Sequence, residues 1–123
     1  MEKNRILLVE DEEDLVATMV IQLKVAGYEV IVARDGLEGL EKAKKENIDL
    51  MILDLMLPKM DGYKVCALLK KDSRYSKIPI MLFSARAQES DFKMGEEAGA
   101  DAYVVKPFEI KALLAKIKEL VGA

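Results

Sequence analysis

The sequence has 123 residues, of which 51% are hydrophobic, and its formal net charge is −3. This length suits one domain with its own core, and the scattered Lys and Arg residues form no basic arm or stripe that would bind nucleic acid. The lack of histidine excludes Ser-His and Cys-His nucleophiles, a lone cysteine excludes an internal disulfide, and no apolar run is long enough to span a bilayer.

Strand and helix patterns alternate along the chain. In chain order, the patterns predict a strand over 5–9, a helix over 13–26, a strand over 28–33, a helix that begins after Asp35, a strand over 50–54, a helix over 62–71, a strand over 80–84, a helix over 88–98, a strand over 102–106 and a helix over 110–121. Gly27 predicts a left-handed cap, and Asp35 with Glu38 predicts a capping box. The lone Cys66 is interpreted as helix packing.

The helix over 88–98 is the weakest of the predicted elements. Its apolar stripe is thin and consists of Phe92, Met94 and Ala98. Gly95 lies inside it, and glycine costs a helix interior about 1 kcal/mol relative to alanine. We therefore expect this helix to be the least stable one.

Five strands that alternate with five helices predict an α/β fold. The expected architecture is a single doubly wound (βα)5 domain over residues 1–123, with a five-stranded parallel sheet and helices on both faces. The flavodoxin-like strand order 2-1-3-4-5 is the common solution for such a domain. That order places the first and third strands side by side, at the point where strand order reverses.

Chemically active side chains follow four of the predicted strands. Glu10 and Asp11 follow the first strand, Asp54 ends the third, Ser84 ends the fourth and Lys106 ends the fifth. The carboxyl ends of parallel strands meet at one edge of the sheet, where open α/β sheets bind ligands. Three carboxylates, a hydroxyl and an ammonium at that edge suit a divalent metal and a phosphoryl group.

The carboxylates predict a magnesium site. Close carboxylates repel one another unless a cation intervenes, and Mg²⁺ prefers a few carboxylates with waters and a phosphate oxygen. We expect Asp11 and Asp54 to be side-chain ligands and Glu10 to act through a water. The alternative, a solvated helix N-terminus over residues 10–14, explains residues 12–14 well. It explains Asp54 poorly, because a charge directly after a buried strand is costly unless it is paired.

Lys106 and Ser84 have both a functional and an ordinary interpretation. The ammonium of Lys106 is expected to pair with Asp54 or with a phosphate on it. Ser84 is expected to donate its hydroxyl to a phosphate oxygen. As single residues they could equally be an exposed lysine and a serine at strand ends, and it is their place beside Asp11 and Asp54 that favours function.

Four motifs in this order and spacing resemble the receiver domain of two-component response regulators. The motifs are Glu10-Asp11, Leu53-Asp54 through Pro58 with Asp61-Gly62, Ser84-Ala85, and Lys106-Pro107-Phe108. The resemblance covers essentially the whole chain. It implies a phosphoacceptor domain that is not an enzyme in the usual sense, with only self-phosphorylation and slow self-dephosphorylation.

The resemblance assigns roles to the residues of the acidic cluster. Asp54 would accept the phosphoryl group from a phosphohistidine. Asp11, Asp54 and the backbone carbonyl of Met56 would hold Mg²⁺, with Mn²⁺ as an alternative ion, assisted by Glu10. This agrees with the physical view that phosphoryl transfer depends mostly on positioning and charge neutralisation.

The resemblance also assigns binding, switching and lifetime roles. Lys106 and Ser84 would bind the phosphoryl oxygens, and the bond from Lys106 to the proline after it is a cis peptide in the family. Tyr103 would turn inward as the Ser84 hydroxyl moves toward the phosphate; the alternative is an ordinary half-buried strand aromatic. Met56 and Arg86 would tune the lifetime of the aspartyl phosphate.

Some residues depart from the common pattern of the family. Glu10 stands where many members have Asp, and Ser84 stands where many have Thr. Ala102 and Lys116 depart from the charged pattern of the large DNA-binding subfamily, which argues against that subfamily's dimer. We expect either a monomer or a phosphorylation-dependent dimer.

Three other functions fit the sequence less well. A metal-dependent phosphatase with an aspartyl nucleophile would need a second Asp where Met56 stands. A pseudo-receiver would lack the acidic, hydroxyl and lysine set that is present here. A dinucleotide-binding domain would need a Gly-x-Gly-x-x-Gly motif after the first strand. The favoured interpretation is a cytoplasmic phosphorylation switch, without contact to membrane or nucleic acid. Its expected partners are a sensor histidine kinase or phosphotransfer protein and a downstream effector of unknown identity.

Overall fold

Strands and helices alternate along residues 4–122, the part of the chain that the computed structural model describes. In chain order the elements are β1 (Arg5–Val9), α1 (Glu13–Val25), β2 (Glu29–Ala33), α2 (Gly36–Lys45), β3 (Leu50–Asp54), α3 (Gly62–Lys71), β4 (Ile80–Ser84), α4 (Glu89–Glu97), β5 (Ala102–Val105) and α5 (Ile110–Val121). The predicted elements are all present, and their bounds differ from prediction by a few residues at most.

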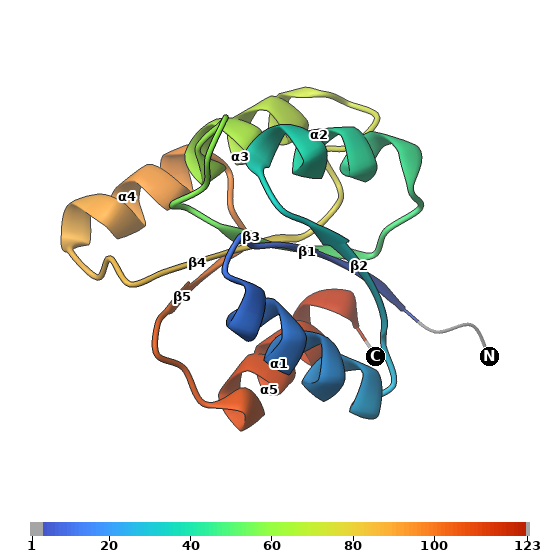
Figure 1. Cartoon of the computed structure of the whole chain (residues 1–123). Helices are drawn as coiled ribbons and strands as arrows, with labels where there is room; N and C mark the ends of the chain where they lie inside the picture. Colours follow the sequence, from blue (N-terminus) through green and yellow to red (C-terminus); the bar gives the residue numbers. More distant parts are fainter. Residues whose placement is uncertain (1–3, 123) are drawn as a thin grey trace.

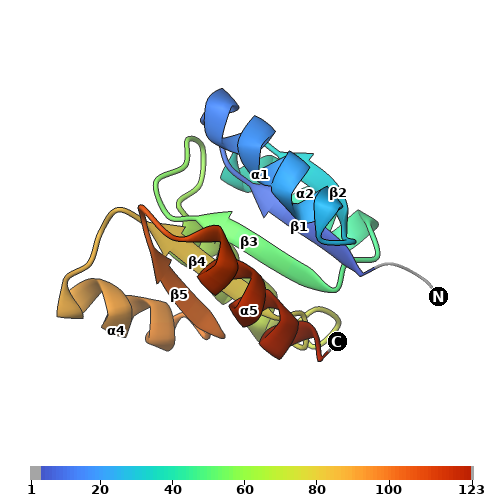
Figure 2. The same ribbon diagram turned by 90° about the horizontal axis from the view of Figure 1, so that it is seen from below.

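The strands form one parallel sheet in the order β2-β1-β3-β4-β5, which confirms the predicted topology. Helices α2, α3 and α4 cover one face of the sheet, and α1 and α5 cover the other (Figure 1). Figure 2 shows the second of these faces, with α1 and α5 in front of the strands. Strand order reverses between β1 and β3, so the loops that leave these two strands open a crevice at their carboxyl ends.

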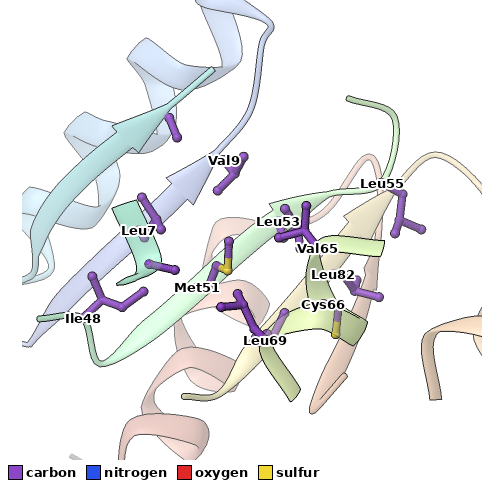
Figure 3. Packing of buried hydrophobic residues seen from close by; sticks show 13 residues of the cluster. Leu7, Val9, Ile48, Met51, Leu53, Leu55, Val65, Cys66, Leu69 and Leu82 are labelled. Carbon is purple, nitrogen blue, oxygen red and sulfur yellow. The ribbon is translucent and has the colours of Figure 1, made fainter. Parts of the chain in front are cut away.

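The sheet is buried on both faces because its apolar side chains alternate between two cores. Leu7 and Val9 of β1 point toward α2 and α3, whereas Ile6 and Leu8 point toward α1 and α5. Figure 3 shows the first of these cores, in which side chains of β1, β3 and β4 meet those of α3. Every residue of β3 and β4 is buried, including the polar residues that end them.

Side chains and glycines set the ends of several helices. The carboxylate of Asp35 accepts a hydrogen bond from the backbone N–H of Glu38 at 2.8 Å, as the predicted capping box requires. The reciprocal bond differs from prediction, because Glu38 accepts from the N–H of Arg34 at 2.7 Å, one residue before the cap. Asp61 caps α3 in the same way, and Gly27 has a φ of 100°, which confirms the left-handed cap.

Helix α4 packs differently from the prediction. The expected apolar stripe is wrong for its two largest members, since Phe92 and Met94 are 40% and 47% exposed. Asp91 and Gly95 are the buried residues of this helix. A Cβ at Gly95 would lie 3.2 Å from the ring of Tyr103, so the glycine lets α4 approach β5 closely. This close contact explains why α4 contains Gly95, although glycine lowers helix propensity.

Within residues 4–122, each helix is too short or too polar to cross a lipid bilayer.

Two neighbouring leucines of α3 test the core. Leu69 is fully buried, and Leu68 is 43% exposed. We expect Leu69→Ala to lower the free energy of unfolding by about 2–5 kcal/mol, because it removes buried apolar surface and leaves a cavity. The matched variant Leu68→Ala should change it by less than about 0.5 kcal/mol. Urea denaturation of both variants measures the difference, and equal losses would contradict the packing of α3.

The thiol of Cys66 gives a second test. Its side chain is fully buried, the Sγ lies 3.5 Å from the carbonyl oxygen of Ala98, and burial raises the pKa of the thiol to about 11. We expect a disulfide reagent such as DTNB to react slowly with the native protein at pH 8, because the thiolate is scarce and enclosed. The denatured protein should react completely within minutes, and a fast native reaction would contradict this burial.

Candidate functional site

The carboxyl ends of β1 and β3 bring three carboxylates together, as predicted. Parallel pairing places Val9 beside Leu53, so the residues that follow in each strand, Glu10 and Asp54, are neighbours. Oxygens of Glu10, Asp11 and Asp54 all lie within 4.8 Å of one another. Glu10 is 1% exposed and Asp54 is 4% exposed, whereas Asp11 faces solvent. Two of the three charges are therefore removed from water and need compensation.

Lys106 supplies that compensation. Its Nζ donates to Oε1 of Glu10 at 2.9 Å and to Oδ2 of Asp54 at 3.2 Å. Strand β4 separates β3 from β5, so the lysine side chain reaches the carboxylates across β4. The ammonium lies 4.6 Å from the centre of the Phe83 ring, which is a favourable cation–π position. The pairing with Asp54 was predicted, and the shorter bond to Glu10 was not.

Direct hydrogen bonds hold both oxygens of the Glu10 carboxylate. Its Oε2 accepts hydrogen bonds from the backbone N–H groups of Asp11 and Glu12 at 2.9 Å and 3.1 Å. Burial raises the pKa of Glu10 to about 7, against the opposing effects of the Lys106 ammonium and the Glu12 N–H. Burial lowers the pKa of Lys106, but its hydrogen bond to Glu10 and the charge of Asp54 outweigh this and raise it. The lysine therefore stays protonated.

The donor set fits a hard divalent cation. Carboxylate oxygens from three residues converge, and Mg²⁺ binds such oxygens together with water. The Oδ1 of Asp54 accepts the backbone N–H of Met56 at 3.0 Å, which brings the Met56 backbone beside the carboxylate. Asp11, Asp54 and Met56, the expected ligand residues, thus lie at one place.

Ser84 lies at the same edge, at the end of β4. It is 1% exposed, and its Oγ accepts the backbone N–H of Arg86 at 3.1 Å. Its carbonyl accepts the N–H of Lys106 at 2.8 Å, so the predicted hydroxyl and ammonium leave adjacent strands at the same level. The peptide bond between Lys106 and Pro107 is cis.

A cavity of about 960 Å³ opens beside the acidic cluster. Asp11, Met56 and Arg86 are among its lining residues, with Tyr63 and Met94 farther along it. Met56 is 59% exposed, and the guanidinium of Arg86 comes within 4.0 Å of Asp91. The two residues predicted to tune the lifetime of the aspartyl phosphate therefore face the same opening as Asp11.

Tyr103 connects this edge to α4. Its hydroxyl donates to the carbonyl of Arg86 at 3.0 Å, in the loop that follows Ser84. Its ring meets that of Phe92 edge to face, with 4.8 Å between the centroids. Tyr63 of α3 adds a hydrogen bond of 2.9 Å to the carbonyl of Asp91. The backbone around the start of α4 is thus held by two tyrosine hydroxyls.

Sequence reasoning missed Phe83 and Tyr63. The predicted strand order places β4 beside β3, which was a signal that residues at the end of β4 lie near Asp54. The observed register sets Phe83 directly opposite Asp54. Tyr63 gave no such signal, since its place in α3 reads as ordinary helix packing.

The fold and these groups define a class of protein, namely a doubly wound domain whose sheet edge carries buried carboxylates, a hydroxyl and an ammonium, a set that suits a divalent cation and a phosphoryl group. The family model of the response regulator receiver domain matches residues 6–118. The chain belongs to this family, whose members are signalling domains rather than classical enzymes and bind Mg²⁺ in such an acidic pocket.

Individual relatives agree with this assignment. The chain is 42% identical over 116 residues to the alkaline phosphatase synthesis transcriptional regulatory protein PhoP of Bacillus subtilis, covering 94% of this chain and 48% of that protein. It therefore spans about half the length of the curated relatives it matches.

Solved structures show the same fold. A CheY-like response regulator receiver domain protein of Methanospirillum hungatei superposes with a TM-score of 0.92 at 31% identity, covering 98% of this chain and 95% of that one. The receiver domain of the sensor histidine kinase PA1611 of Pseudomonas aeruginosa superposes with a TM-score of 0.91 at 27% identity, covering 99% and 100%. Its structure has a magnesium ion coordinated in the active-site cleft.

Replacing Lys106 tests the charge balance of the cluster. We expect Lys106→Met to lower the free energy of unfolding at pH 7 by about 1.5–3 kcal/mol in metal-free buffer, because two buried carboxylates lose a charged donor. The deficit should shrink as the pH falls from 7 toward 5, since Glu10, with a pKa of about 7, then binds a proton and needs no cation.

Urea denaturation in EDTA at both pH values measures this effect. The substitution Lys111→Met, at an exposed residue, serves as the control and should change the free energy of unfolding by less than about 0.5 kcal/mol. A Lys106→Met protein as stable as the control at pH 7 would contradict the proposed balance.

Proposed function

We propose that this chain is a phosphorylation switch in which Asp54 accepts a phosphoryl group from a phosphohistidine. The observation that carries the proposal is a buried carboxylate, 4% exposed, that shares one ammonium with Glu10 beside the exposed Asp11. Burial of a charged group costs desolvation free energy, and such groups cluster at functional sites, where the chemistry requires them. We further propose that residues 1–123 form one receiver domain.

In the transfer step, a carboxylate oxygen of Asp54 attacks phosphorus. The new O–P bond forms as the P–N bond to the donor histidine breaks, and the electron pair of that bond returns to the imidazole nitrogen. Lys106, already beside Asp54, exchanges its hydrogen bond to the carboxylate for one to a phosphoryl oxygen, and the Ser84 hydroxyl donates to another. Lys106 is already within hydrogen-bond distance of Asp54 and needs little reorganisation, whereas the Ser84 hydroxyl moves toward the phosphoryl group.

The metal site would use the chain's own oxygens. Asp11, Asp54 and the backbone carbonyl of Met56 would hold Mg²⁺, or Mn²⁺ in its place, with Glu10 assisting through a water. A bound divalent ion supplies charge neutralisation for the phosphoryl oxygens. The direct hydrogen bonds of Glu10 to Lys106 and to two backbone N–H groups fix its carboxylate for this supporting role.

The switch would pass from Ser84 to Tyr103 and then to α4. A Ser84 hydroxyl drawn to the phosphate releases its bond to the Arg86 N–H, and Arg86 is the residue whose carbonyl accepts from Tyr103. Movement of that loop frees the tyrosine to turn inward and lets the α4–β5–α5 face present a different surface. Self-dephosphorylation is slow in this scheme, and Met56 and Arg86 set its rate.

The partners follow from the same chemistry. A sensor histidine kinase or a phosphotransfer protein supplies the phosphohistidine, and an effector of unknown identity binds the switched face. The curated relatives of similar sequence, such as PhoP, are transcriptional regulators. We assign no nucleic-acid or membrane contact to this chain itself. We propose a cytoplasmic protein that is a monomer or dimerises on phosphorylation.

Phosphorylation by a small donor tests the proposal. We expect acetyl phosphate with Mg²⁺ to add about 80 Da to the wild-type protein, the mass of one phosphoryl group. Asp54→Asn should gain no mass, because the amide is not a nucleophile, and EDTA should abolish the gain in the wild type. Intact-protein mass spectrometry measures all three.

Asp14→Asn is the control, since Asp14 is exposed in the first turn of α1 and has no assigned role. It should be phosphorylated like the wild type. An unmodified wild type, or an Asp54→Asn protein modified to the same extent, would overturn the assignment.

A further inference from the structure

The loop that joins β3 to α3, residues 55–61, carries the Met56 backbone of the proposed metal site. Its ends are tied together, since the N–H of Gly62 donates to the carbonyl of Leu55 at 3.2 Å. The N–H of Leu55 donates to the carbonyl of Phe83 at 3.2 Å, which fastens the start of the loop to β4. Leu55 is thus anchored, whereas the residues that follow it, Met56 among them, need support from other contacts.

The far side of the loop rests on the N-terminal end of α2. The N–H of Gly36 donates to the carbonyl of Pro58 at 3.4 Å. Lys59 adopts a left-handed φ of 69°, and its Nζ lies 3.5 Å from a carboxylate oxygen of Asp35. A residue other than glycine rarely adopts this conformation, so the surroundings of the loop must hold it there.

Gly36 has no room for a side chain. A Cβ on it would lie 2.0 Å from the carbonyl oxygen of Met60 and 2.9 Å from the carbonyl carbon. The close approach alone requires glycine, because the structure gives Gly36 no positive φ. The obstacle is backbone, so a side-chain rotation cannot relieve it. To reach an ordinary contact of 3.4 Å, an added methyl group would have to push the loop away by about 1.4 Å.

We infer that Gly36, which lies outside the acidic cluster, is a positioning residue for metal binding and phosphoryl transfer. It lets α2 press against residues 58–60 and so sets where the loop holds the Met56 backbone and the Asp54 carboxylate bonded to it. This inference rests on the proposed metal site. A substitution far from the reacting atoms that misplaces them by about 1 Å can reduce the reaction rate about a hundredfold.

Gly36→Ala tests the inference, with Gly39→Ala as a matched control in the same helix. A Cβ at Gly39 would meet the two Cγ atoms of Val9 at 3.0 Å, a core side chain rather than the loop. Both variants should lower the melting temperature. Calorimetric titration with Mg²⁺ alone, well below each melting temperature, should show about tenfold weaker binding for Gly36→Ala and less than a twofold change for Gly39→Ala.

Lys59→Gly is a second variant that keeps the test decisive if Gly36→Ala does not fold. The Lys59 side chain is 66% exposed, so its loss leaves the core intact. The substitution removes the ion pair that joins the loop to Asp35 at the start of α2, and glycine adds backbone freedom to the loop. We expect severalfold weaker Mg²⁺ binding, although removal of a nearby positive charge alone would strengthen it. Unchanged or tighter binding in the folded variants would overturn the inference. Absence of Mg²⁺ binding by the wild type would instead overturn the proposed function.

Discussion

The ammonium of Lys106, placed between Glu10 and Asp54, is the interaction on which the site depends. Two carboxylates that are almost completely buried would repel each other and lose their hydration, and a single cation at 2.9 Å and 3.2 Å offsets both costs. The Phe83 ring beneath the ammonium gives it a favourable surface without adding charge. The parallel sheet makes this arrangement available, because all its strands deliver their ends to one edge.

The same arrangement explains how a stable core and a reactive edge coexist. Strands β3 and β4 are buried along their whole length, so the carboxylate and the hydroxyl that end them are presented by the most rigid part of the fold. Helix α4, in contrast, buries an aspartate and a glycine and exposes two large apolar side chains. In the proposed mechanism these rigid groups would bind the phosphoryl group, and α4, with its thin buried face, would be the element that responds.

Support for the site extends beyond the residues that carry charge. A backbone hydrogen bond between Gly62 and Leu55 joins the two ends of the loop after Asp54. The loop also packs against α2 at Gly36, where there is no space for a Cβ atom. Gly62, which follows the loop, has the same property, since an added Cβ would lie 2.6 Å from the Asp54 carbonyl oxygen. One glycine brings the loop close to α2, and the other brings the start of α3 close to the end of β3.

The sequence by itself determined the alternation of strands and helices and the residues that end each strand, because periodicity and turn chemistry are local properties of the chain. The strand order followed as the common solution for such an alternation. It thereby located Glu10, Asp11, Asp54, Ser84 and Lys106 at one edge. The tertiary structure alone decided that Lys106 pairs with Glu10, 96 residues away, that Phe83 lies beneath it, and that Phe92 and Met94 face solvent. The requirement for glycine at position 36 could not be predicted from the sequence either. These features depend on distances between side chains and backbone of different elements, and such distances are set only when the elements pack.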